Sequence, residues 1–295
     1  MLDIFSLEKN RKNISLKVTR IRLGCIIIGV IGLLIIFNIN CSNFVPFVYG
    51  LIFGLISLDV WLEKRLSKDF LDNTKSEYIA NLLEKLNKDD LKIEFDRQNF
   101  IPQNSFFING LYPPKCDEYT GNDLFVGKKG DIDFMFSDIF IRVISHFEKG
   151  KYSIKNGEIV NTKVLFGGTF FIADIKRDIS GTLYACAKYN PNLKPRGKRQ
   201  VMDNVLFEKY FTTYSDDAIN TRYILNPRIM EKIVAFRQML DCSMSVVFFA
   251  KKVYFYVDNR TDNFEVHIGK DIRTNFKKIK AEIEKFLAIV EEINN

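Results

Sequence analysis

Apolar and charged residues are distributed unevenly along the chain. Residues 23–58 carry no charged side chain, and a single helix over this stretch would be about 54 Å long, well beyond the ~30 Å hydrocarbon core of a membrane. Asparagine and serine residues ahead of Pro46 indicate a turn that divides the stretch into two helices. The pattern predicts a transmembrane helical hairpin over residues 23–62, rather than a buried hairpin of a soluble protein or a cleaved signal peptide.

Basic residues flank the predicted hairpin on both sides, whereas the turn within it has neither Lys nor Arg. They are Lys9, Arg11, Lys12, Lys17, Arg20 and Arg22 before it, and Lys64, Arg65 and Lys68 after it. Because Lys and Arg in short loops stay on the cytoplasmic side, residues 1–22 form a predicted cytoplasmic N-terminal segment. The expected localisation is the cell (inner) membrane, multi-pass, with both termini cytoplasmic and the lipid bilayer as a partner.

The remaining sequence predicts a helical stalk followed by one α+β domain. Residues 63–90 form the stalk, because apolar residues recur at helical spacing over residues 66–86. Residues 91–295 form a predicted cytoplasmic α+β domain, mainly antiparallel, because strand-like runs follow one another with helices at the ends. The predicted strands are 91–95, 132–136, 139–147, 163–175, 181–189, 245–249 and 253–257, and the last two are joined as a hairpin by residues 250–252.

Two predicted helices complete the domain. One begins after Asn226 and Pro227, and the other ends the chain. Apolar residues of the C-terminal helix alternate in steps of four and three over residues 272–293, which predicts packing on the domain's own sheet. A coiled coil between two copies is the alternative, since three heptads are the lower limit for one. Phenylalanines in the seam, and charges that oppose the helix dipole, favour packing on the sheet.

Charge and cysteine content restrict the partners. The chain has a net charge of +7 and five cysteines; these include no CxxC pair, which fits a reducing compartment and gives no support to a zinc ribbon. A basic cluster in a Pro- and Gly-punctuated stretch either contacts phosphates or anionic lipid headgroups, or it is a solvated loop. The candidate binding residues are Lys194, Arg196, Lys198, Arg199 and Arg222. No aromatic residues are interleaved with the cluster, so nucleic acid is not an expected partner.

Two segments carry a resemblance to a known family. Residues 166–174, Phe-Gly-Gly-Thr-Phe-Phe-Ile-Ala-Asp, resemble a Phe-Lys-Gly-x-Phe-Phe-Val-Ala-Asp stretch, and residues 214–227 resemble a Tyr-Ser-Asp-Asp-Gln-x-Glu-Ala-Arg-Tyr-Ile-Leu-Thr-Pro signature. Their order and spacing are similar to a bacterial family known only as domain of unknown function 3137, over roughly residue 70 to the C-terminus. The resemblance implies the fold and a hydrophobic pair before the domain, and it brings no catalytic residues. The chain differs from the two family patterns at Gly167, Ala218, Asn220, Thr221 and Asn226.

The signature residues are expected to be structural. They are Gly167, Gly168, Asp174, Tyr214, Ser215, Asp216, Asp217, Tyr223 and Pro227. Ser215 is a predicted helix N-cap, with Asp216 and Asp217 in the first turn, where carboxylates favour the helix N-terminus. The alternative is a carboxylate pair for acid–base or metal chemistry with Arg222 as an anion clamp. Adjacent residues of a helix do not share a face, which favours the capping role.

Sequence motifs for catalysis are absent. There is no nucleophile elbow, phosphate loop or dinucleotide fingerprint, and His146 and His267 lack partner ligands at metal-binding spacing. We therefore expect no cofactor and no metal. The favoured function is a membrane-anchored cytoplasmic binding or scaffold domain that engages another protein or a lipid surface. The alternative is a membrane-tethered hydrolase that uses Asp174, Asp216 or Asp217 with Arg222.

Overall fold

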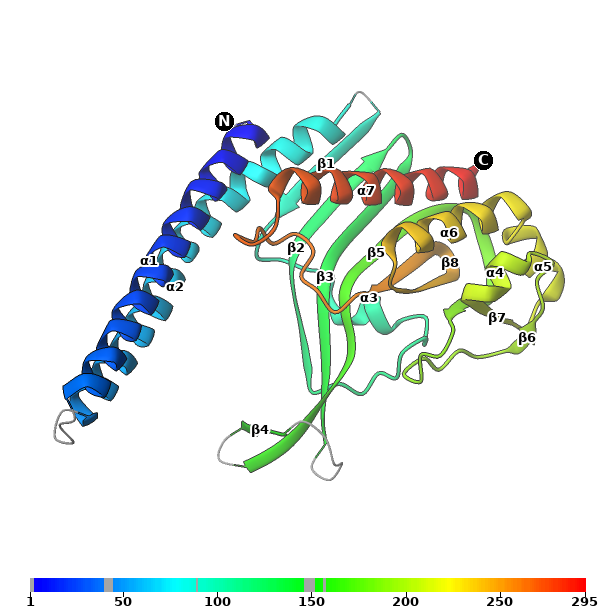
Figure 1. The fold of residues 1–295 in the computed structure, drawn as a ribbon. Helices are drawn as coiled ribbons and strands as arrows, with labels where there is room; N and C mark the ends of the chain where they lie inside the picture. The colour runs from blue at the N-terminus through cyan, green and yellow to red at the C-terminus, as the bar shows by residue number, and fades with distance from the viewer. Residues whose placement is uncertain (1–2, 40–44, 89, 146–151, 156–157) are drawn as a thin grey trace. The chain divides into compact units, whose positions relative to one another are not determined.

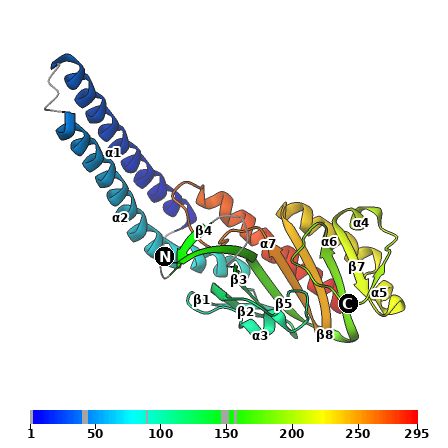
Figure 2. The ribbon, with the colours of Figure 1, turned by 90° about the horizontal axis from the view of Figure 1, so that it is seen from below.

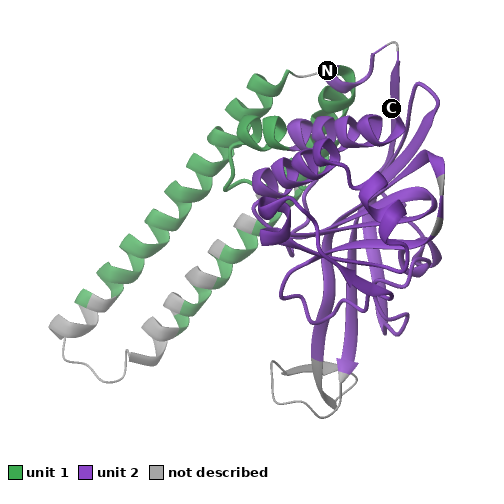
Figure 3. Ribbon diagram, turned by 90° about the vertical axis from the view of Figure 1, so that its right-hand side faces the viewer, with its two compact units in different colours: residues 1–84, 265–278 green, residues 85–264, 279–295 purple. Residues whose placement is uncertain are grey.

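The computed structural model describes residues 3–39, 45–88, 90–145, 152–155 and 158–295 (Figures 1 and 2). The chain forms two compact units, which Figure 3 distinguishes by colour. The helical unit comprises residues 1–84 and 265–278, and the sheet unit comprises residues 85–264 and 279–295.

Two long helices form most of the helical unit. They are α1 (Ile4–Ile39) and α2 (Val45–Leu86), and residues 272–278 of α7 (Ile272–Asn294) also belong to this unit. α2 includes residues 66–86, so the helix predicted there is confirmed. Large apolar side chains such as Ile27 and Phe53 are exposed on the two helices.

No helix in the described part of the chain is long and apolar enough to cross a membrane. The predicted transmembrane hairpin over residues 23–62 is therefore wrong, and so is the multi-pass membrane localisation that followed from it. The apolar runs do not form helices of their own, because each continues into a charged segment: residues 9–22 in α1 and residues 59–85 in α2. Most of the predicted turn between the runs lies outside the described residues.

Buried charged groups of the helical unit are paired. The Glu8 carboxylate accepts hydrogen bonds from Arg11 at 2.9 and 2.8 Å and from the main-chain N–H of Ile272 at 2.9 Å. These bonds, with those from Arg11 contributing most, hold the pKa of Glu8 below its usual value. Lys75 is 1% exposed and forms an ion pair with Glu265. Pairing is required because an isolated charge in the interior is strongly unfavourable.

The sheet unit is built on one eight-stranded sheet in which every pairing is antiparallel. The strands are β1 (Leu91–Asp96), β2 (Glu118–Lys129), β3 (Ile132–Ser145), β4 (Tyr152–Lys155), β5 (Glu158–Ala187), β6 (Lys198–Gln200), β7 (Phe211–Ser215) and β8 (Ser243–Asp258). Their order is β1-β2-β3-β5-β7-β6, and β4 and β8 also pair with β5. The predicted α+β class, with an antiparallel sheet and a C-terminal helix, is confirmed.

Two predicted breaks in the strands are bends within continuous strands. β5 includes the strand predicted at 163–175 and all but the last two residues of the strand predicted at 181–189. β8 includes both arms of the predicted hairpin at 245–257. Ala250 has a left-handed backbone, with φ of 52°, where the register between β5 and β8 shifts. Pairing continues on either side, from Gly168 opposite Asp258 to Ala185 opposite Val246. Pairing with a neighbouring strand determines whether such a segment forms a bulge or a hairpin, and the local turn residues do not distinguish the two.

Helices cover one face of the sheet, which we call the helix face (Figure 2). α6 (Pro227–Leu240) and residues 279–294 of α7 lie on it. The Phe286 ring packs against Phe134, Phe171 and Phe255, with centroids 6.3, 4.5 and 5.3 Å away. The two helices are joined by an ion pair of 2.6 Å between Lys232 and Glu292. The prediction that the C-terminal helix packs on its own sheet is confirmed.

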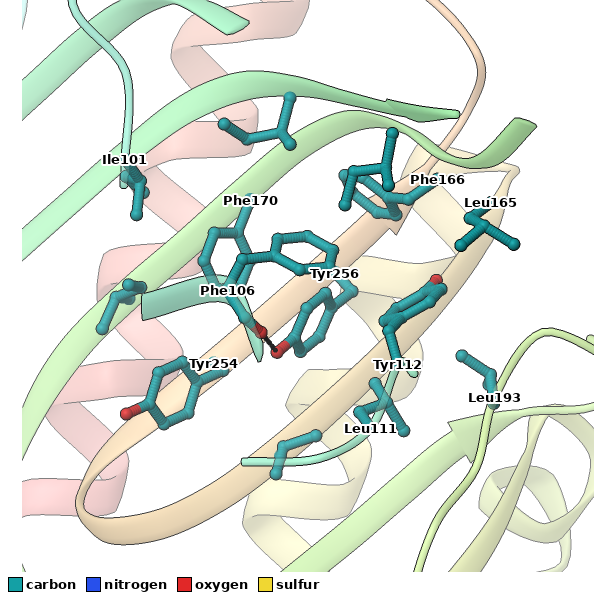
Figure 4. Close-up of a cluster of buried hydrophobic side chains, with 14 of the residues drawn as sticks. Ile101, Phe106, Leu111, Tyr112, Leu165, Phe166, Phe170, Leu193, Tyr254 and Tyr256 are labelled. Carbon is teal, nitrogen blue, oxygen red and sulfur yellow. Dashed lines mark hydrogen bonds between the residues drawn. The ribbon is translucent and has the colours of Figure 1, made fainter. Parts of the chain in front are cut away.

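Irregular chain covers the opposite face, which we call the loop face. The short helix α3 (Gln103–Phe107) and the segments 108–117 and 188–197 lie there. Phe106 is fully buried against Phe166, Phe170 and Tyr256, with ring centroids 5.2, 4.8 and 5.0 Å away (Figure 4). The Tyr256 hydroxyl donates to the main-chain oxygen of Phe106 at 2.9 Å, so a tyrosine of the sheet holds the covering segment in place.

Candidate binding pockets on the loop face

The segment 188–197 separates two pockets of the sheet unit. Leu193 and Pro195 line one of them, whereas Lys194 and Arg196 line the other. This alternation is the one expected of extended backbone, in which successive side chains point to opposite sides. We call the second pocket the basic pocket and the first the tyrosine pocket.

The basic pocket has a volume of about 520 Å³. Its lining comes from residues 107–114, from the bend of β5 and from the segment 194–196. The residues are Phe107, Ile108, Asn109, Gly110, Tyr112, Pro113, Pro114, Gly181, Thr182, Tyr184, Lys194, Arg196, Asp216 and Phe249. Lys194, Arg196 and Asp216 are exposed, whereas Asn109, Tyr112 and Tyr184 are buried. The pocket therefore combines a fixed aromatic wall with charged groups that solvent can reach.

Hydrogen bonds hold the wall of the basic pocket in one conformation. The main-chain N–H of Lys194 donates to Leu111 O at 2.7 Å, which joins the two covering segments. The Tyr184 hydroxyl donates to Asn109 O at 2.7 Å, and the Asn109 amide donates to the Tyr256 hydroxyl at 2.8 Å. Such fixed geometry lowers the entropy lost when a ligand binds.

The charges of the basic pocket suit an anionic group next to a hydrogen-bond donor. Lys194 and Arg196 each carry a positive charge, and Arg196 can bind a carboxylate through two parallel hydrogen bonds. Asp216 adds an acceptor in the same pocket. Burial raises the pKa of Tyr184, although the nearby Arg196 charge opposes this shift. Tyr184 is therefore a neutral wall residue at neutral pH.

The tyrosine pocket has a volume of about 430 Å³. It is lined by Cys186, Ala187, Lys188, Tyr189, Asn190, Pro191, Leu193, Pro195, Thr212 and Tyr214. Tyr189 is 97% exposed and has a left-handed backbone, with φ of 63°. For a residue other than glycine this conformation costs about 1–2 kcal/mol. Burial raises the pKa of the Cys186 thiol to about 12, so the thiol is protonated at neutral pH and is a poor nucleophile.

The predicted basic cluster is divided between three places. Lys194 and Arg196 lie in the basic pocket. Lys198 and Arg199 are on β6, and Arg199 forms an ion pair of 3.7 Å with Glu208. Arg222 is an exposed residue of α5 (Ala218–Ile224) and does not line either described pocket. Two of the five candidate residues thus line the same pocket.

The three candidate carboxylates have separate roles in the structure. Asp217, not Ser215, is the N-cap of α5, and it accepts hydrogen bonds from the N–H groups of Ile219 and Asn220 at 3.1 and 2.9 Å. Asp174 forms an ion pair with Lys252, and Asp216 lines the basic pocket. The predicted Ser215 cap was misplaced because Ser215 belongs to β7, where its hydroxyl accepts from the Asp217 N–H at 3.2 Å.

Several signature residues support the elements around the pockets. Gly168 has φ of 140°, and a Cβ there would lie 2.3 Å from Val257 O, so β5 requires glycine at this point. The Gly167 N–H donates to Asp258 at 3.2 Å. Tyr223 stacks under the Arg177 guanidinium at 4.4 Å. Asn226 caps α6 ahead of Pro227, as predicted.

The aromatic wall was not found by sequence reasoning. Asn109, Tyr112 and Tyr184 come from segments far apart in the sequence, and Tyr189 has no motif around it. The only local signals are the Asn109-Gly110 pair and Pro113-Pro114, which predict a turn and no more.

Comparisons with known proteins give a match to one family over part of the chain, and no activity. Residues 164–295 match the family model described as a protein of unknown function, DUF3137. This part of the chain contains both signatures, and the predicted resemblance is confirmed over a shorter range than residue 70 to the C-terminus. No curated protein and no solved structure matches the chain.

Proposed function

We propose that the sheet unit is a non-catalytic binding module that takes an acidic side chain of a partner protein in the basic pocket. The observation that carries this proposal is the placement of Lys194 and Arg196 in one preformed pocket with an aromatic wall. Ligand sites typically combine apolar and aromatic walls with a small number of placed polar groups.

Asp216 favours a peptide over a lipid headgroup. A peptide segment supplies a carboxylate for Lys194 and Arg196, and its main-chain N–H groups supply donors for Asp216. A headgroup phosphate would satisfy the two cations but brings no such row of donors. The arrangement therefore supports a protein partner.

The separate roles of the carboxylates support binding rather than hydrolysis. Asp217 caps α5 and Asp174 is paired with Lys252, which leaves Asp216 as the one candidate carboxylate among the described residues of the pocket. A general acid–base pair needs two groups within reach of one substrate atom. The hydrolase alternative would thus depend on Asp216 alone.

Affinity capture with the full chain tests the proposal. The wild type is compared with the Lys194→Ala/Arg196→Ala double variant and with a matched control, Lys163→Ala/Lys251→Ala, which removes two exposed lysines outside the pockets. We expect partner recovery to fall at least ~10-fold in the pocket variant only, at an unchanged melting temperature. Equal recovery by both variants contradicts the proposal. Turnover in a hydrolase screen that is lost in Asp216→Asn would support the alternative.

A further inference from the structure

The tyrosine pocket contains a residue with a strained backbone, Tyr189, whose side chain does not pack in the core. Tyr189 has a left-handed backbone and a side chain that is 97% exposed. No hydrogen bond or ring contact of Tyr189 is present within the described part of the chain. Left-handed backbone at a residue other than glycine is concentrated at ligand-binding and active sites.

The lining of the tyrosine pocket matches a specific ligand class. Four of its ten lining residues carry rings: Tyr189, Tyr214, Pro191 and Pro195. Grooves made of aromatic rings recognise polyproline II segments, whose proline rings stack on them. Because a polyproline II segment has no internal hydrogen bonds, its carbonyl groups can accept from the protein, and a tyrosine hydroxyl is a suitable donor.

The charges around the pocket indicate the neighbouring residues of the ligand. Lys188 lines the tyrosine pocket, and Lys194 and Arg196 lie on the other side of the ridge formed by residues 193–196. Because residues 193–196 line the two pockets alternately, a peptide that crosses this ridge contacts both pockets. Charge complementarity therefore favours an acidic segment.

We infer that the tyrosine pocket binds a proline-containing, polyproline II segment of the partner protein, and that an acidic residue of the same segment occupies the basic pocket. This inference rests on the proposed function, because it names the ligand of which the acidic side chain is a part. It adds Tyr189 and Tyr214 as specificity-determining residues.

Three synthetic peptides measured by calorimetry against the full chain test the inference. The first has a proline-rich half followed by two glutamates, the second has alanines in place of the prolines, and the third has lysines in place of the glutamates. Variants of the first peptide with one to four spacer residues locate the distance between the two halves. We expect the first peptide to bind at least ~10-fold more tightly than either of the others.

The Tyr189→Gly variant separates a binding role from a structural one. Glycine relieves the left-handed strain, so the melting temperature should be unchanged or higher, while the dissociation constant for the first peptide rises at least ~10-fold. Tyr214→Phe, which keeps the ring, should weaken binding less than Tyr214→Ala. Val201→Ala, an exposed position outside both pockets, should change nothing.

Distinct outcomes identify which proposal fails. If the first and second peptides bind equally and Tyr189→Gly has no effect, the inference is overturned while the proposed function stands. If the third peptide binds as tightly as the first, and Lys194→Ala/Arg196→Ala has no effect, the proposed function is overturned. If the first peptide does not bind at ~1 mM, the inference is overturned, and the capture experiment alone decides the proposed function.

Discussion

The helix face of the sheet is built from phenylalanines, whereas the loop face is built around tyrosines. Phe134, Phe171 and Phe255 contact Phe286 of α7, and Phe255 also contacts Phe236 of α6. On the other side Tyr112, Tyr184, Tyr254 and Tyr256 lie in the cluster that packs against the covering loops. The loop-face cluster thus brings four tyrosine side chains into the interior of the sheet unit.

The difference follows from what covers each face. A helix satisfies its own backbone hydrogen bonds and presents only side chains to the sheet. Irregular chain leaves carbonyl groups that need partners when they are buried. Tyr256 and Tyr184 supply these partners to Phe106 and Asn109. Irregular covering also fits the sheet less completely, and this leaves the two pockets between its segments.

The largest effect should come from removing a ring of the helix face. Phe286→Ala deletes a fully buried side chain at the centre of the contact between α7 and the sheet. We expect a loss of about 3–5 kcal/mol in the free energy of unfolding, because a cavity remains. Urea denaturation measures it, with the exposed neighbour Lys285→Ala as control. A loss below ~1 kcal/mol would show that α7 is not essential to this face.

A buried carboxyl group on the helix side should make stability depend on pH. Burial raises the pKa of Asp138 to about 8, although Thr169 donates to it at 2.6 Å. Between about pH 4 and pH 8 the folded state keeps a proton that the unfolded state has lost. Stability should therefore fall as pH rises, by at most about 1.4 kcal/mol per pH unit.

Asp138→Asn should flatten this dependence. Unfolding free energies at several pH values between 5 and 8 measure the slope, and Asp133→Asn, an exposed position on the same strand, should keep the wild-type slope. Equal slopes for wild type and Asp138→Asn would mean that another group is responsible.

On the loop face the hydroxyl groups should matter separately from the rings. Tyr256→Phe keeps the ring but leaves Phe106 O and the Asn109 amide without this partner. We expect a loss of about 1–3 kcal/mol. Tyr254→Phe is the matched control, because no hydrogen bond from its hydroxyl is present within the described part of the chain, and it should change stability by less than ~0.5 kcal/mol. Similar losses would contradict the hydrogen-bond account of this face.

The smallest effect should separate the adjacent residues Asp216 and Asp217. Asp217→Ala removes the N-cap of α5 and should reduce stability by about 0.5–2 kcal/mol. Asp216→Ala changes an exposed residue of the basic pocket and should leave the melting temperature unchanged while altering peptide affinity. Thermal unfolding of both variants checks this. A larger loss of stability in Asp216→Ala than in Asp217→Ala would contradict the separate roles of the two carboxylates.

Much of the helix face could be predicted from the sequence. The apolar stripe of residues 272–293, and the cap formed by Asn226 ahead of Pro227, indicate α7 and α6 directly. The spacing of apolar residues along a helix indicates which of its faces is buried. The antiparallel α+β class could also be predicted, because strand-like runs follow one another in the sequence with helices at the ends. By contrast, the absence of charge in residues 23–58 did not predict where the helices begin and end. Both α1 and α2 extend beyond this stretch.

The loop face and its pockets were decided by the tertiary structure. Asn109 and Tyr256, which are hydrogen-bonded, lie 147 positions apart in the chain, and β5 continues through its bend because β8 pairs with it on both sides. The basic cluster of the sequence contained Lys194 and Arg196 but did not separate them from Lys198 and Arg199. Periodicity determines which side of a helix or strand is buried, whereas the segment that covers it, and the pockets left between covering segments, depend on contacts that no local pattern encodes.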